Sequence, residues 1–97
     1  MRVIAKAALR VFWEGRPDAE QPLKAWYAEA RAATWKTPAD VKGKYRSASV
    51  LRDSRIVFNI AGNKYRLVVK IRYAFQVIYI RFLGTHRQYD QIDAETV

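Results

Sequence analysis

The sequence contains no cysteine and is poor in proline, glycine and acidic residues. Of its 97 residues, 3 are proline and 4 are glycine, and 9 acidic residues stand against 18 lysines and arginines. The absence of cysteine excludes disulfides, thiolate metal sites and a cysteine nucleophile, so nothing points to an oxidising compartment. The scarcity of proline and glycine, together with 51% hydrophobic residues, excludes a disordered or fibrous chain. We therefore expect one folded domain over residues 1–97.

Long hydrophobic runs are also missing. No apolar stretch approaches the roughly 18 residues of a membrane span. The opening residues Met1–Lys6 lack the apolar segment and the cleavage site of a signal peptide. We therefore expect a cytoplasmic protein with no membrane partner.

Positive charge is abundant and unevenly distributed. The chain has a net charge of +9, and the segment Lys36–Arg72 holds ten basic residues against two acidic ones. Clustered basic charge favours a polyanionic partner, nucleic acid above all. The alternative is that the charge serves only the solubility of a small protein.

Hydrophobic spacing predicts two helices in the first third of the chain. Apolar residues recur at intervals of three and four over 5–14 and again over 19–34, with Asp18 as the N-cap of the second helix. The short connection predicts an antiparallel helical hairpin. A third, short helix is predicted over 38–44, because Thr37 suits an N-cap and a proline follows it. The aromatic residues of the first two helices are interpreted as core rather than as base-stacking groups: Trp13, Trp26 and Tyr27.

From residue 48 onward the pattern changes to alternation. It predicts strands over 48–51, 56–60, 65–73 and 76–82, with Arg2–Ile4 as an additional edge strand. Turn residues at 53–54, 61–63 and 73–75 connect them. The predicted fold class is α+β: a two-helix hairpin packed on a small antiparallel sheet.

Alternation in the strand that begins at Lys64 assigns apolar residues to one face and cations to the other. The second face then carries Lys64, Arg66, Lys70 and Arg72. Such a row indicates a bound anion, or else separate exposure of each cation at a sheet edge. Arg66 is the strongest candidate, because a guanidinium binds phosphate through two parallel hydrogen bonds. Arg81 is a further charge at a position where the pattern otherwise indicates packing.

The only histidine lies in a short polar motif. His86, Tyr89 and Asp90 recur at i, i+3 and i+4, so one helical turn would place all three on one face. Imidazole and phenol can transfer protons and a carboxylate can orient them, although the same turn could simply pack its tyrosine. The sequence has neither metal-ligand spacing nor a P-loop, so we expect no metal or cofactor. A base, an acid and cations suffice to cleave RNA through its own 2′-hydroxyl.

Two signatures carry a family resemblance. The first is Gly-Asn-Lys-x-Arg-Leu within Val57–Leu67, and the second is Gly-Thr-His-x-x-Tyr-Asp, which ends at Asp90. Segments Leu23–Tyr27 and Trp35–Asp40 agree as well. Over nearly its whole length the chain resembles the HigB toxins of the RelE-like superfamily. The resemblance implies a RelE-like fold and metal-independent, ribosome-dependent cleavage of mRNA. It also implies a HigA-type helix-turn-helix antitoxin as partner, beside the ribosome and mRNA, with operator DNA bound only through that antitoxin.

The resemblance also assigns roles to residues. Four would carry the chemistry: Arg66, Arg81, His86 and Tyr89. Four more would bind RNA or support the site: Lys36, Lys42, Lys64 and Asp90. The arginines would neutralise the scissile phosphate, while the choice between His86 and Tyr89 as general base stays open. Asp90 either supports His86 or caps the final turn.

Two other functions fit the same residues. A non-catalytic basic module would bind RNA or the ribosome and block translation by occupancy. An interaction subunit would use its basic face only to receive an acidic partner. Only cleavage of transcripts distinguishes the toxin from both.

Overall fold

Four α-helices and one five-stranded sheet make up the structure, a computed structural model that describes residues 1–97. The helices are α1 (Lys6–Gly15), α2 (Glu20–Ala32), α3 (Pro38–Lys44) and α4 (His86–Tyr89). The strands are β1 (Arg2–Ile4), β2 (Ser49–Val50), β3 (Arg55–Ile60), β4 (Tyr65–Arg72) and β5 (Val77–Thr85). Single 3-10 turns lie at Pro17–Ala19 (η1) and Tyr73–Phe75 (η2). None of the helices combines the length and the apolar character needed to cross a membrane.

The sheet confirms the predicted α+β class but corrects the prediction of a purely antiparallel sheet. Its strand order is β1-β5-β4-β3-β2, and β1 runs parallel to β5 while all other neighbours are antiparallel. The antiparallel neighbours follow one another through short turns, which force the chain to reverse. No turn joins β1 to β5, so this edge pair is free to run parallel.

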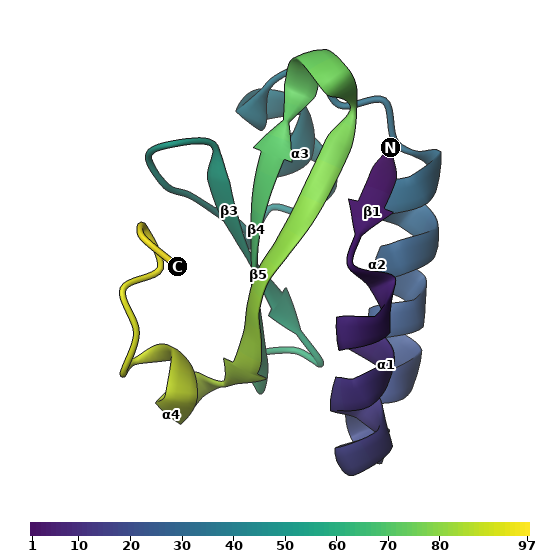
Figure 1. Cartoon of the computed structure of the whole chain (residues 1–97), viewed down its shortest axis with the longest axis vertical. Helices are drawn as coiled ribbons and strands as arrows, with labels where there is room; N and C mark the ends of the chain where they lie inside the picture. Colours follow the sequence, from purple (N-terminus) through teal and green to yellow (C-terminus); the bar gives the residue numbers. More distant parts are fainter.

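The turns lie where the sequence predicts them. Asp53 and Ser54 between β2 and β3, and Ala61 and Gly62 between β3 and β4, all have φ between 55° and 68°. Consecutive residues with positive φ match the right-handed twist of the strands that they join. The turn at Tyr73–Phe75 joins β4 to β5, and Figure 1 shows β3, β4 and β5 side by side.

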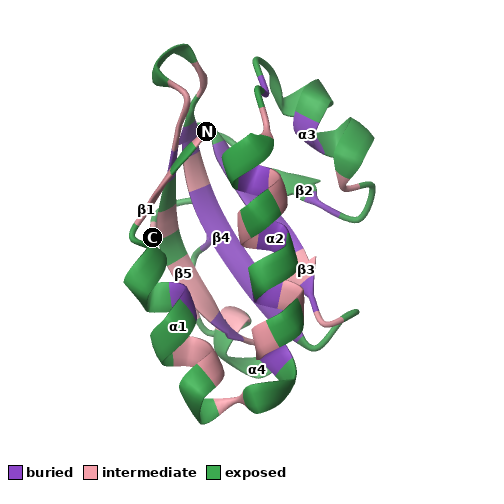
Figure 2. Cartoon of the chain, turned by 90° about the vertical axis from the view of Figure 1, so that its right-hand side faces the viewer, coloured by how far each residue is buried: buried purple, intermediate pink, exposed green.

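The first two helices cover one face of the sheet, as Figures 1 and 2 show. Their apolar stripes place Leu9, Leu23 and Trp26 in the main core, each at most 2% exposed. Trp26 meets the Phe58 ring of β3 edge to face, with 5.4 Å between centroids, which confirms its structural role. Trp13 and Tyr27 also contact this core but stay half-buried.

The opposite face of the sheet is covered by the C-terminal segment, a cover that no local sequence pattern predicts. Val57 of β3 and Val68 of β4 form a second, smaller cluster with Ala94, and Ile92 and Val97 pack against it. In Figure 1 this yellow segment and α4 lie on the side of the sheet away from α1 and α2. The second face of β4 is therefore not an open row of cations. It carries a buried apolar centre, and charged residues surround it.

Candidate active site

Arg66 lies in the middle of the sheet, on the face that the C-terminal segment covers. Register pairs it with Asn59 of β3 and Gly84 of β5, and only 9% of the residue is exposed. Of the two alternatives for the basic row, separate exposure at a sheet edge is therefore wrong for Arg66, because β4 has a neighbour on both sides. A guanidinium held here is desolvated, which strengthens its attraction for an anion.

The turn before β4 fixes the orientation of the Arg66 side chain. Its Nη2 donates to Asn63 Oδ1 at 2.8 Å and its Nη1 donates to the Asn63 carbonyl oxygen at 3.1 Å. On its other side the guanidinium carbon lies 6.0 Å from the centroid of the Tyr89 ring. Asn63 and Arg66, both in the Gly-Asn-Lys-x-Arg-Leu signature, are thus hydrogen-bonded to each other. The second signature contacts the same guanidinium through Tyr89.

Gly84 leaves the space opposite Arg66 free of a side chain. A Cβ atom at this position would lie 2.7 Å from both Gln88 Oε1 and Phe82 Cζ. Real Cβ atoms essentially never lie this close to a neighbour, so a side chain at position 84 would displace the Phe82 ring and the Gln88 side chain that caps α4. The glycine therefore serves the placement of α4.

Helix α4 is the short helical turn that the motif spacing predicts. Thr85 caps it, with Gln88 N donating to Thr85 Oγ1 at 3.1 Å and Thr85 N donating to Gln88 Oε1 at 2.9 Å. Within the turn, His86 Nδ1 lies 3.2 Å from Asp90 Oδ2, and both side chains are more than half exposed. With a proton on Nδ1 donated to Asp90, His86 Nε2 is left as an acceptor toward solvent.

Tyr89 points differently from His86 and Asp90. Its ring packs against Phe82 of β5 at 6.4 Å between centroids and faces Arg66. The turn therefore presents two groups with different neighbours: an exposed imidazole beside a carboxylate, and a half-buried phenol beside a guanidinium.

Arg81 lies at a β-bulge. Val68 pairs with Phe82 and Val69 with Ile80, so Arg81 is the extra residue in β5. Ile80 packs with the main core and Phe82 with the smaller cluster. Arg81 also reaches toward the smaller cluster, since its Nε donates to the Val97 backbone oxygen at 3.1 Å. The bulge thus adds a second cation to the face that carries Arg66.

Arg55 is a third arginine of this face, and the sequence reading did not select it. Its side chain is 7% exposed and donates to the same Val97 oxygen, from Nη2 at 2.7 Å and from Nε at 3.1 Å. It also donates to Asp53 Oδ2 at 2.8 Å, and this bond, with a further one from Lys70, holds the pKa of Asp53 below its usual 3.8. In the sheet Arg55 begins β3 directly opposite Lys70.

Lys64 lies beside the site but is already paired. Its Nζ bonds Asp18 Oδ2, and the Tyr65 hydroxyl donates to Asp18 Oδ1 at 2.6 Å. These two hydrogen bonds lower the pKa of Asp18, and the bond from Lys64 has the larger effect. The prediction of Asp18 as N-cap of α2 is wrong, since no side chain caps that helix and Ala19 holds the cap position. The carboxylate instead bonds Lys64, which precedes the distant strand β4, and Tyr65, the first residue of that strand.

Lys36 and Lys42 are not brought to this site. They belong to the α3 region, which Figure 1 places at the opposite end of the sheet from α4. Lys42 Nζ donates to the carbonyl oxygens of Arg46 and Ala48, each at 2.6 Å, so it holds the loop before β2. Lys36 is exposed.

Comparison with known proteins agrees with the signatures. The family model for HigB toxins, described as the RelE-like toxic component of a toxin–antitoxin system, matches residues 19–92. This chain belongs to the HigB toxin family. It is 30% identical over 92 residues to the mRNA interferase toxin HigB of Escherichia coli K12, an alignment that covers 93% of this chain and 88% of that protein. The mRNA interferases HigB of Escherichia coli O157:H7 and Shigella flexneri match to the same extent.

The match to the HigB family extends over the whole candidate site. Residues 19–92 include both signatures, the bulge at Arg81 and all of α4. Arg66 and Arg81 on one sheet face, Tyr89 beside Arg66, and the exposed His86–Asp90 pair of the same turn therefore all lie within the family's matched region. Lys36, Lys42 and Lys64 lie within it too, but away from that face or engaged elsewhere.

Proposed function

We propose that this HigB-family chain is a ribosome-dependent mRNA endoribonuclease that inhibits translation. The observation that carries the proposal is that one helical turn, α4, places Tyr89 beside Arg66 and also carries the His86–Asp90 pair. The relatives' names, which call them mRNA interferases, support the same activity. Residues 1–97 would act as one domain.

The proposed reaction uses the 2′-hydroxyl of the RNA itself as nucleophile. The 2′-oxygen attacks the adjacent phosphorus and the bond from phosphorus to the 5′-oxygen breaks, which leaves a 2′,3′-cyclic phosphate and a 5′-hydroxyl. One group of the site takes the proton from the 2′-hydroxyl and another delivers a proton to the leaving oxygen. His86 and Tyr89 are the two candidates for these transfers, and Asp90 orients His86.

The arginines supply charge where the reaction develops it. In the transition state the phosphate oxygens become more negative, and donors already in place stabilise that charge most. Arg66 is held by Asn63 and has little exposure, so it is preorganised for this role. Arg81 adds a second guanidinium from the bulge. Because these groups and the 2′-hydroxyl provide all that the reaction needs, we propose that it requires no metal.

The remaining basic residues would serve binding of mRNA and ribosome. Lys64, with Lys36 and Lys42 further away, would contribute phosphate contacts whose strength falls with salt. The partner in the cell would be a HigA-type helix-turn-helix antitoxin, and operator DNA would be bound only through it. Both toxin and partner would be cytoplasmic.

Mapping of mRNA ends after brief induction tests the proposal. The wild type, His86→Ala and the matched control Arg87→Ala, which alters the adjacent exposed residue of α4, are compared on one reporter mRNA with and without its start codon. We expect cuts within the coding region that need the start codon, persist in Arg87→Ala and disappear in His86→Ala. A chelator selective for transition metals, added to a purified translation reaction with magnesium kept at the level that ribosomes require, should leave the cutting rate unchanged.

Growth arrest without any cuts would contradict cleavage. It would favour instead the basic module that blocks translation by occupying the ribosome.

A further inference from the structure

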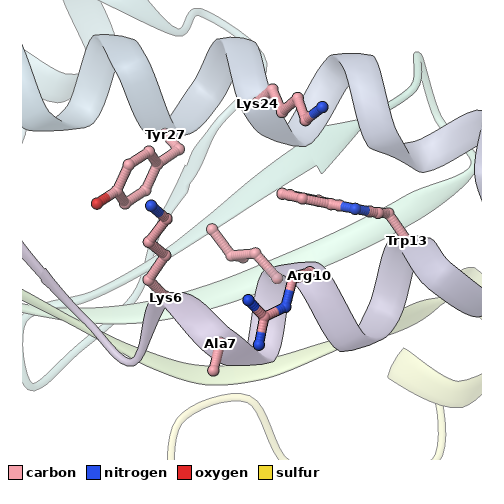
Figure 3. A pocket seen from close by; sticks show the side chains of 7 residues that line it. Lys6, Ala7, Arg10, Trp13, Lys24 and Tyr27 are labelled. Carbon is pink, nitrogen blue, oxygen red and sulfur yellow. The ribbon is translucent and has the colours of Figure 1, made fainter.

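A groove of about 460 Å³ runs between α1 and α2. Figure 3 shows Tyr27 and Trp13 at its two ends, with Lys6 and Arg10 of α1 between them and Lys24 on the α2 side. Leu9 also lines it and is fully buried. The groove therefore has an apolar floor, aromatic ends and a cationic rim.

The cations on this rim are available to a partner. Three basic residues line the groove and no acidic residue does. Arg10 and Lys24 pair only with Glu14 and Glu20 of their own helices, in i,i+4 contacts whose side chains are 37% to 67% exposed. Exposed pairs of this kind contribute little to stability, so a carboxylate from a partner can replace them at small cost.

The aromatic rings of the groove are already covered on one face. Lys6 Nζ lies 5.0 Å from the Tyr27 centroid, and Lys24 Nζ lies 5.5 Å from the Trp13 centroid. Single-stranded RNA binds through aromatic faces on which its bases stack. Rings that are occupied by ammonium groups offer a poor stacking platform, and a small apolar pocket between two helices suits a side chain of a protein better.

The groove lies on the helical side of the sheet, whereas Arg66 and α4 lie on the other side. A molecule bound between α1 and α2 therefore does not occupy the proposed RNA site. The family itself supplies a protein partner, because it is the toxic component of a toxin–antitoxin system.

We propose that the groove between α1 and α2 is the docking site for an acidic amphipathic segment of the antitoxin. Carboxylates of that segment would meet Lys6, Arg10 and Lys24, and one apolar side chain would enter over Leu9, between Trp13 and Tyr27. This inference rests on the antitoxin partner of the proposed function. To that function it adds the surface of the toxin where the antitoxin binds and the chemistry of the antitoxin segment that fits this surface.

Charge reversal on the rim tests this docking site. The variant Lys6→Glu/Arg10→Glu/Lys24→Glu is compared with Arg46→Glu/Arg72→Glu/Arg87→Glu, which makes the same change in net charge at exposed positions outside the groove. Affinity for the purified cognate antitoxin is measured by calorimetry at two salt concentrations, and thermal unfolding verifies that both variants fold. We expect the groove variant to bind about tenfold or more weakly, with a shallower salt dependence, and the control to bind like the wild type.

The groove variant should keep its mRNA cleavage, since none of its three substitutions touches the proposed site. Equal antitoxin affinity in all three proteins would overturn the docking site while leaving the proposed function intact. Lost cleavage with full antitoxin affinity would assign the groove to RNA or ribosome. Absence of antitoxin binding by the wild type would refute the partner itself and the docking site with it, and the cleavage assay would then judge the nuclease separately.

Discussion

The guanidinium of Arg66 lies 6.0 Å from the centroid of the Tyr89 ring and links the start of β4 to the last helical turn of the fold. The two residues are 23 positions apart and belong to different signatures. They meet because β5 pairs with β4 until Thr85 and α4 begins at the next residue. The end of β5 therefore determines where the proposed catalytic groups lie.

Arg66→Lys is expected to lower cleavage by about 10²-fold or more while the protein stays folded. Lysine keeps the charge but loses the planar fork that Asn63 holds with two bonds. Loss of one preorganised donor to a transition-state anion costs about 10² to 10³ in rate. Rates of reporter mRNA cleavage and the unfolding temperature check it. A folded Arg66→Lys with full activity would remove Arg66 from the site.

Gly84→Ala is expected to destabilise the protein by about 1–3 kcal/mol and to reduce cleavage. The new Cβ would overlap with Gln88 Oε1 and Phe82 Cζ, so α4 has to shift or lose the capping bonds of Gln88. Gly43→Ala in α3 is the matched control, because a Cβ there meets nothing within 4 Å. Urea unfolding should place the control within about 1 kcal/mol of the wild type. If both variants unfold alike, steric approach of α4 is not the reason for Gly84.

Local pattern predicts much of this fold. The spacing of apolar residues predicts α1 and α2, Thr37 predicts the start of α3, and alternation predicts the buried face of β4. Each of these features depends on residues close in sequence. The helical turn at His86 is predictable for the same reason, since its spacing and its cap are both local.

Features that depend on distant segments could not be predicted. Asp18 resembles an N-cap locally, but Lys64 and Tyr65 bind its carboxylate from 46 and 47 residues away. The second face of β4 reads as a basic row until the C-terminal segment folds onto Val68. Arg55 is tied to the C-terminal segment through its hydrogen bonds to the Val97 oxygen, 42 residues away. The bulge at Arg81 likewise depends on the pairing of two strands, which alternation within one strand does not reveal.

Asp18→Asn is expected to reduce stability at pH 7 and to flatten the acid end of the stability curve. Bonds from Lys64 and Tyr65 lower the pKa of Asp18 from 3.8, so the stability that its carboxylate contributes is present above pH 3.8 and is lost as pH falls through the lower folded value. The urea midpoints of wild type and variant should therefore differ at pH 7 and converge below pH 3.8. Glu14→Gln, in an exposed pair with Arg10, is the control and should show little difference at pH 7. A difference between the two urea midpoints that persists unchanged at pH 2 would refute the stabilisation by ionised Asp18.

Tyr89→Phe separates the two candidates for the general base. Phenylalanine keeps the ring contacts with Phe82 and Arg66 and removes only the hydroxyl. Asp90 contacts His86 Nδ1 at 3.2 Å, the arrangement in which a carboxylate orients an imidazole that exchanges a proton at its other nitrogen. We therefore expect His86→Ala to lower the cleavage rate by about 10²-fold or more, and Tyr89→Phe by less than about tenfold.

The Asp90 contact provides an independent check of the same assignment. Asp90→Asn keeps the size of the side chain but removes the negative charge beside the imidazole. We therefore expect its loss of cleavage rate to lie between that of Tyr89→Phe and that of His86→Ala. Single-turnover cleavage by ribosome-bound toxin measures all three without a contribution from product release. A larger loss of cleavage rate in Tyr89→Phe than in His86→Ala would assign the general base to the phenol of Tyr89.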